Sequence, residues 1–244
     1  MKKILEPKEI FSEITDDYKS IYENHLISII LYGSGAGTDY HPDRSNLDFL
    51  IVLSEEAIDQ LEKAFDIVSR WRKKNVTVPL FMTRFYIDSS CDSYPLEFLN
   101  MQKSYTVVYG EDVLKTISFK KEELRCQCER EIKGKLLLLR KGFLMTGGKR
   151  ARIQELISES ITAFISIFRG LLYLKDIEAP NSAESVIEVT AREFSFEKDT
   201  FLRCFLIKMG EVPSHQDITI VFKAYLKEVR KLSKHIDSFV ESSD

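Results

Sequence analysis

Residues 31–53 read LYGSGAGTDYHPDRSNLDFLIVL. This stretch holds the end of one apolar run and the whole of another, separated by a glycine-rich segment. The first run, residues 27–32, is rich in isoleucine and ends at Gly33; the second covers residues 47–53. Short β-branched runs bounded by turn residues are typical of buried strands. The stretch therefore predicts two neighbouring strands joined by a turn of small residues.

The segment after the first predicted strand has the composition of a phosphate-binding turn. Glycines at positions 33, 35 and 37 lack the Cβ atoms that would obstruct a close approach. Such a turn can present backbone N–H groups and the hydroxyl of Ser34 to a phosphate. The same composition also suits an ordinary tight turn, so the turn alone does not identify a site.

Two polar residues, Asn46 and Asp48, lie at the start of the second predicted strand. Side chains two residues apart in a strand point to the same face. Both carry oxygen atoms, the ligands that Mg²⁺ prefers. A polar pair in an apolar strand also costs free energy unless it has a partner. The pair and the turn together predict a site for a metal-bound triphosphate, with Gly33 and Ser34 at the phosphates and Asp48 at the metal.

This arrangement resembles the nucleotidyltransferase superfamily, whose antibiotic-modifying, tRNA-end and antitoxin-like members share a Gly-Ser turn followed by Asp-x-Asp on the next strand. Gly33 and Ser34 match the turn, and Asn46 and Asp48 match the acid pair, within a resemblance that covers roughly residues 25–85. The resemblance implies ATP or another nucleoside triphosphate as substrate and Mg²⁺ as cofactor. It also implies transfer of a nucleotide to a hydroxyl group of an acceptor, with Asp48 and Asn46 at the catalytic positions.

The sequence departs from the family pattern at two positions. Asn46 replaces the first acid, and Thr77 lies where the third acid is expected, on the predicted strand 76–83. Two-metal catalysis relies on carboxylates that hold both ions about 4 Å apart. Asp48 is then the one matching acid. The chain is either a transferase with impaired chemistry or a catalytically degenerate homologue that acts as a binding or regulatory module.

Other acids offer alternatives for the missing charge. Asp39 and Asp43 lie in the predicted turn on either side of His41, and Glu97 lies beyond the third strand. Loop carboxylates are more often solvated, and a glutamate near a helix start is more often a helix-terminal charge.

The hydrophobic period changes at about residue 120. Before that point, helical spacing alternates with strand-like runs: a helix over 7–24, a helix from Ser54 to about Lys74 with Phe65 and Trp71 on its apolar face, a third strand at 76–83 and a fourth at 105–109. Pro79 removes a backbone donor, which places the third strand at a sheet edge or a bulge.

After residue 120 every segment has helical spacing, over residues 121–145, 150–175, 183–194, 197–209 and 216–240. We therefore predict an α+β chain. Residues 1–118 form a nucleotidyltransferase-like domain with a mixed sheet and flanking helices, and residues 119–244 form an all-α helical bundle in which aromatic residues such as Phe164, Phe168 and Tyr173 belong to the core.

Composition and charge narrow the candidate partners. Residues 1–118 contain 13 Lys and Arg against 19 Asp and Glu, and residues 119–244 contain 22 against 19. This asymmetry is too mild to predict a nucleic-acid surface. The partners that the resemblance implies are a nucleotide and an unknown acceptor. The four cysteines match neither a disulfide framework nor a zinc pattern. We find no signal-peptide pattern and expect a cytoplasmic protein without a membrane partner. A third interpretation assigns the activity to the helical half, as an association surface in a homodimer.

Overall fold

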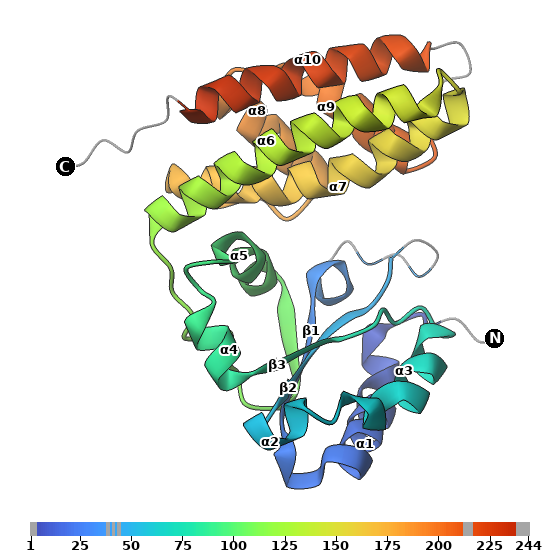
Figure 1. Cartoon of the computed structure of the whole chain (residues 1–244), viewed down its shortest axis with the longest axis vertical. Coiled ribbons are helices and arrows are strands. Elements are labelled where there is room, and N and C mark those ends of the chain that lie inside the picture. The colour runs from blue at the N-terminus through green and yellow to red at the C-terminus, as the bar shows by residue number, and fades with distance from the viewer. Residues whose placement is uncertain (1–3, 38–39, 41, 43–44, 212–216, 238–244) are drawn as a thin grey trace. The chain divides into compact units, whose positions relative to one another are not determined.

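The computed structural model describes residues 4–37, 40, 42, 45–211 and 217–237. The chain divides into two compact units, Met1–Phe119 and Lys120–Asp244, which we call the N-terminal and C-terminal units and describe separately (Figure 1). The alternative site residues Asp39, His41 and Asp43 lie outside the described residues.

The N-terminal unit contains a four-stranded sheet with the strand order β3-β2-β1-β4. The strands are β1 (Leu26–Tyr32), β2 (Asp48–Leu53), β3 (Leu80–Thr83) and β4 (Tyr105–Gly110). Strand β1 is antiparallel to both of its neighbours, whereas β2 and β3 are parallel. The predicted mixed sheet is therefore confirmed, and its central strands are the two apolar runs from which the sequence was interpreted.

Helices cover both faces of this sheet because the central strands are apolar on both sides. Ile29, Phe49 and Ile51 pack towards α1 (Phe11–Tyr22) and α3 (Phe65–Arg72). Ile30 and Leu50 pack towards the other pair, α4 (Arg84–Ser89) and α5 (Pro95–Lys103). Figure 1 shows the two helix pairs on opposite sides of the strands. Successive strand residues point to opposite faces, so each run fills two cores at once.

The helix predicted from Ser54 to about Lys74 is broken into α2 (Glu55–Ile58), a 3₁₀ turn η4 (Leu61–Ala64) and α3. Gln60, between the first two pieces, has φ −123° and ψ 39°, outside the helical region. The break shifts the helical phase, so the predicted apolar face is wrong in part: Trp71 is buried, but Phe65 is 69% exposed. Ser54 holds the N-cap position without capping through its hydroxyl.

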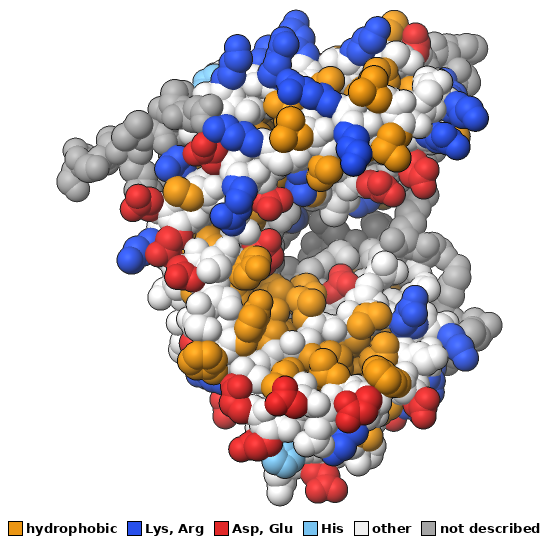
Figure 2. Space-filling view, in the orientation of Figure 1, with side chains coloured by type: hydrophobic (Ala, Val, Ile, Leu, Met, Phe, Trp, Pro, Cys, Tyr) orange, Lys and Arg blue, Asp and Glu red, His pale blue; other side chains and the backbone are white. Residues whose placement is uncertain are grey.

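Strand β3 begins only after Pro79 and is therefore shorter than predicted, and it lies at a sheet edge, as predicted. Val76 makes only an isolated parallel bridge with Leu47, and regular pairing begins at Leu80. Apolar side chains gather on the face of the N-terminal unit that carries this edge (Figure 2). Exposed apolar residues of this region include Val78, Leu80, Phe85 and Tyr86.

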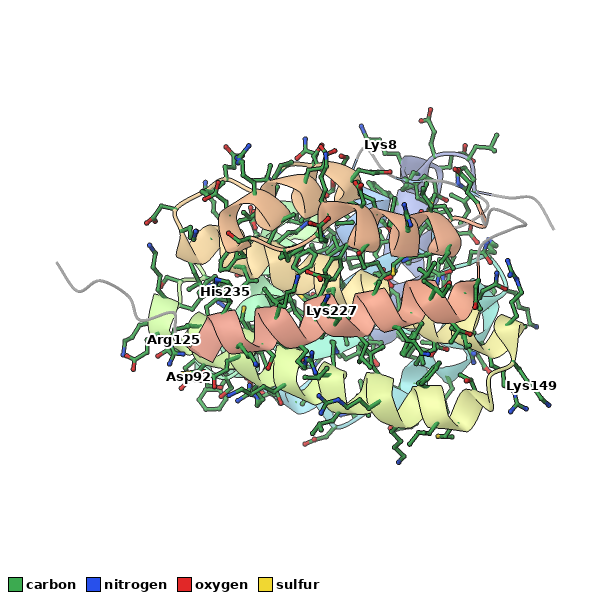
Figure 3. The ribbon with its side chains drawn as sticks, turned by 90° about the horizontal axis from the view of Figure 1, so that it is seen from above. Lys8, Asp92, Arg125, Lys149, Lys227 and His235 are labelled. Carbon is green, nitrogen blue, oxygen red and sulfur yellow. The ribbon has the colours of Figure 1, made fainter. Side chains whose placement is uncertain are left out.

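The C-terminal unit is a bundle of helices, as predicted. They are α6 (Lys121–Thr146), α7 (Arg150–Leu174), α8 (Ala183–Phe194), α9 (Lys198–Lys208) and α10 (Ile218–Asp237). The turn between α6 and α7 contains Gly147 and Gly148, both with positive φ, which glycine adopts without strain. In Figure 3, Lys149 marks the start of α7, and Lys227 and His235 lie on α10.

Helix α7 supplies much of the bundle core. Its length and composition would allow it to cross a membrane, but its residues Ile157, Phe164 and Phe168 are fully buried against the other helices. The ring of Phe164 packs edge to face against Tyr225 of α10. Tyr173 is 39% exposed, so its assignment to the core was wrong. All four cysteines are free thiols.

Candidate functional site

The glycine-rich segment forms a tight turn directly after β1. Residues Gly33–Ala36 make a short 3₁₀ helix, η3, and Gly33 has φ +70°, which favours glycine. A Cβ atom at Gly35 would lie 2.8 Å from Cδ2 of Leu47, closer than carbon atoms approach without displacement. The side chain of Ser34 is exposed. Glycines at these two positions let the turn pack against the start of the second strand and leave the serine accessible.

Ser104, the residue before β4, holds this turn in place. Its carbonyl oxygen accepts a hydrogen bond of 2.9 Å from the N–H of Gly33. A Cβ atom at Gly37 would lie 2.9 Å from Oγ of Ser104, so the far end of the turn also approaches this residue. Because the N–H of Gly33 is engaged here, Gly33 shapes the turn while Ser34 carries the accessible hydroxyl. The sequence does not predict this role of Ser104, because the residue belongs to no motif and is far from Gly33 along the chain.

Asp48 is brought next to the turn by strand pairing. It is the first residue of β2 and lies opposite Tyr32, the last residue of β1 before Gly33. Its oxygen Oδ2 lies 3.8 Å from the position that a Cβ atom of Gly33 would occupy. One carboxylate oxygen thus faces the glycine turn, as the spacing of the sequence predicts.

Thr77 adjoins the same carboxylate. Its hydroxyl Oγ1 lies 2.8 Å from Oδ1 of Asp48 and donates a hydrogen bond to it. The N–H of Thr77 donates to the carbonyl oxygen of Leu47 at 3.0 Å, which fixes the backbone beside the start of β2. Thr77, the residue at the position where the resemblance leads us to expect a third acid, therefore presents a neutral hydroxyl to Asp48.

Asn46 is less firmly held. It precedes β2 and is exposed, and strand pairing of this segment begins only at Leu47. The alternation of side chains along a strand therefore orients Asp48 but does not extend to Asn46. Glu97 lies in the first turn of α5 and is exposed, which fits the helix-terminal role.

Two tyrosines lie in register with Asp48 across the sheet, on strands β1 and β4. Tyr32 lies between Asp48 on β2 and Tyr105 on β4. Burial, followed by the negative charge of Asp48, raises the pKa of the Tyr32 phenol above its ordinary value. The hydroxyl of Tyr105 donates to Oδ2 of Asp112 at 3.1 Å, and burial and this hydrogen bond raise its pKa as well. Both shifts favour the protonated phenol, and the hydrogen of Tyr105 is donated to Asp112.

The donor set among the described residues does not fit a pair of magnesium ions. Within the described residues, no group of three or more His, Cys, Asp or Glu side chains is arranged to hold a metal ion. Among the described residues, Asp48 supplies the carboxylate at the turn, and the hydroxyl of Thr77 donates a hydrogen bond to one of its two oxygens. The remaining oxygen fits one Mg²⁺, because this ion is commonly held by a single carboxylate together with phosphates and water.

Comparisons with known proteins identify the fold. No family model matches the chain, and no curated protein matches it. Among solved structures, the chain is similar to a spectinomycin adenyltransferase from Enterococcus faecialis, determined with ATP and spectinomycin. The identity is 12%, the TM-score is 0.55, and the match covers 90% of this chain and 99% of that chain. At this identity the likeness shows the fold alone: a nucleotidyltransferase-like fold whose sheet is followed by a helical region.

Proposed function

We propose that the chain binds a nucleoside triphosphate, ATP in the first instance, with its phosphates at the turn formed by Gly33 and Ser34. The observation that carries this proposal is the position of Asp48, whose Oδ2 faces the turn. A cation between this oxygen and a phosphate would link the carboxylate to the nucleotide. The ATP present in the spectinomycin adenyltransferase structure supports the choice of nucleotide.

Calorimetric titration with ATP and Mg²⁺ tests this proposal. We expect the native protein to bind and Gly33→Ala to lose binding, because alanine cannot hold φ +70° without strain and would reshape the turn. Gly148→Ala is the matched control: its φ is +76°, and its Cβ would meet open space. No binding by the native protein at millimolar ATP, or equal binding by both variants, would show that the turn is not the nucleotide site.

Transfer of a nucleotide to a hydroxyl acceptor is the second candidate function. It is favoured by the extent of the structural match, which includes the helical region of an enzyme whose structure contains an acceptor, spectinomycin. We test this by incubating the protein with pooled hydroxyl compounds, spectinomycin among them, and ATP labelled at the α-phosphate. If the chain is active, the labelled nucleoside monophosphate should appear on the acceptor hydroxyl and pyrophosphate should be released. Asn46→Asp, which restores the first acid, should increase any such activity.

The opposing interpretation is a catalytically degenerate binding or regulatory module. It is favoured by the donor set, in which Asn46 and Thr77 replace two acids of the family pattern. Binding of ATP without label transfer, in the native protein and in Asn46→Asp alike, would support this interpretation.

Compartment and assembly also belong to the proposal. We expect a cytoplasmic protein, and we expect any homodimer to be visible by light scattering. A dimer that is disrupted by substitutions in the bundle and retained by turn variants would assign association to the C-terminal unit.

A further inference from the structure

Thr77 is fixed beside Asp48 by its backbone. Its N–H is bound to the carbonyl oxygen of Leu47 at 3.0 Å, and the preceding residue, Val76, bridges to Leu47. The N–H of Leu47 in turn donates to the carbonyl oxygen of Asn75 at 3.0 Å. Thr77 cannot move away from the carboxylate without breaking this short parallel pairing. The backbone pairing at this sheet edge therefore holds Thr77 next to Asp48.

The single hydrogen of the Thr77 hydroxyl has two acceptors within reach. Oδ1 of Asp48 lies at 2.8 Å and the carbonyl oxygen of Leu47 at 3.3 Å. A hydrogen bond to a carboxylate is charge-assisted and shorter than one to a neutral carbonyl, so the hydrogen goes to Asp48. This bond fixes the rotation of the carboxylate and uses one lone pair of Oδ1. It leaves Oδ2 directed towards the glycine turn.

The neutral side chains of Asn46 and Thr77 also affect how a triphosphate can approach the site. Carboxylates repel a triphosphate unless cations lie between them. The repulsion between two negative charges at short range costs more free energy in a partly buried site than in water. An amide at Asn46 and a hydroxyl at Thr77 avoid the additional repulsion that acids at these two positions would cause, and they supply no metal ligand of full charge. A nucleotide can then approach with fewer cations than an active site with three acids requires.

We propose that Thr77 is a positioning residue that restricts this site to one divalent cation, bound by Oδ2 of Asp48 and brought to the site together with the nucleotide. The proposal rests on the proposed nucleotide binding. In this proposal the Thr77 hydroxyl orients the carboxylate of Asp48, at the position where the resemblance leads us to expect a third acid. The structural basis is the hydrogen bond to Oδ1 together with the orientation of Oδ2.

Counting bound Mn²⁺ by electron paramagnetic resonance, with a saturating non-hydrolysable ATP analogue, tests the number of cations. We expect one Mn²⁺ for each native chain and two for the double variant Asn46→Asp/Thr77→Asp, which restores both acids. Either two ions or no ion on the native chain would overturn the proposal. A double variant that still binds one ion would also overturn it.

The positioning role is tested with Thr77→Val, which keeps the volume and removes the hydroxyl. Removing a hydrogen bond to a metal ligand weakens metal affinity by about tenfold, so we expect this loss for Mn²⁺ at saturating analogue. Thr77→Ser should restore the affinity. Affinity for the analogue in the presence of a chelator should be unchanged, and an equal loss there would make Thr77 merely structural and overturn the proposal.

Binding of the analogue to the native protein is measured with Mn²⁺ and with a chelator. This measurement separates the proposal of nucleotide binding from the proposal of a single cation. Absence of analogue binding with and without cation would refute nucleotide binding itself. Binding of the analogue together with two cations, or with no effect of Thr77→Val, would refute the cation restriction alone.

Discussion

Tyr32 and Asp48 lie directly opposite each other on the antiparallel strands β1 and β2, at the end of the sheet from which the glycine turn begins. Burial and the neighbouring carboxylate both favour the neutral phenol, so the pKa of Tyr32 is raised. Burial also raises the pKa of Tyr18 in α1 and of Tyr225 in α10. The folded chain therefore holds several phenols that resist ionisation.

Stability should fall in alkaline solution. A phenol whose pKa is higher in the folded than in the unfolded chain stabilises the fold below its ordinary pKa of 10.0 and loses this contribution as the pH rises further. Each such tyrosine lowers the free energy of unfolding by at most about 1.4 kcal/mol per pH unit above that value. Urea unfolding at successive pH values, with phenolate absorbance recorded in parallel, measures the effect. Tyr32→Phe should reduce the slope; ionisation of all ten tyrosines before unfolding would contradict the expectation.

Gly110→Ala should be far more damaging than Gly147→Ala, although both glycines have positive φ. A Cβ atom at Gly110 would lie 2.0 Å from the carbonyl oxygen of Ile27, inside the β1–β4 pairing, whereas one at Gly147 would meet open space. We expect a loss of about 3 kcal/mol or more for Gly110→Ala and about 1 kcal/mol for Gly147→Ala. Urea denaturation of both variants measures the difference. Equal losses would mean that backbone strain alone, and not the close approach, governs position 110.

Asp17→Ala should destabilise the packing of α1 against α3. Oδ2 of Asp17 accepts a 2.8 Å hydrogen bond from Nε1 of Trp71, a side chain that is 1% exposed, and it also pairs with Arg70. Leaving the indole N–H without a protein acceptor costs about 2 kcal/mol. The chain has one tryptophan, so its fluorescence reports the change directly during denaturation. Asp16→Ala, at an exposed neighbouring position, is the control and should cost under about 0.5 kcal/mol.

The elements predicted most accurately from the sequence are those with a strong local cause. Strands β1 and β2 follow from apolar runs between turn residues, and α8 begins and ends at the predicted residues Ala183 and Phe194. The break between α2 and η4 has no such signal, because Asp59 and Gln60 are acceptable helix residues. Packing onto the sheet, which sets the burial of Ala64 and Trp71, overrides the helical period there.

The candidate site was predictable only in the part that lies within one strand–turn–strand segment. The turn at Gly33 and the carboxylate of Asp48 are close in sequence, and the strand–turn–strand pattern predicts that they adjoin, as the structure has them. Ser104 and Thr77 reach the same point through sheet pairing from later segments. Thr77 was located only through the resemblance, and its hydrogen bond to Asp48 depends on side-chain geometry that no linear pattern contains.

The strand order β3-β2-β1-β4 has a consequence for the newly made chain. All four strands lie within residues 26–110, ahead of the first helix of the bundle. On the ribosome, the sheet can therefore close before the bundle has been synthesised, because domains generally fold as units in the order of synthesis. Until β4 leaves the exit tunnel, the apolar strand β1 has one unpaired edge, which is a template for wrong pairing. During the interval between the synthesis of β1 and of β4, the nascent chain therefore exposes an apolar strand edge that the folded sheet covers.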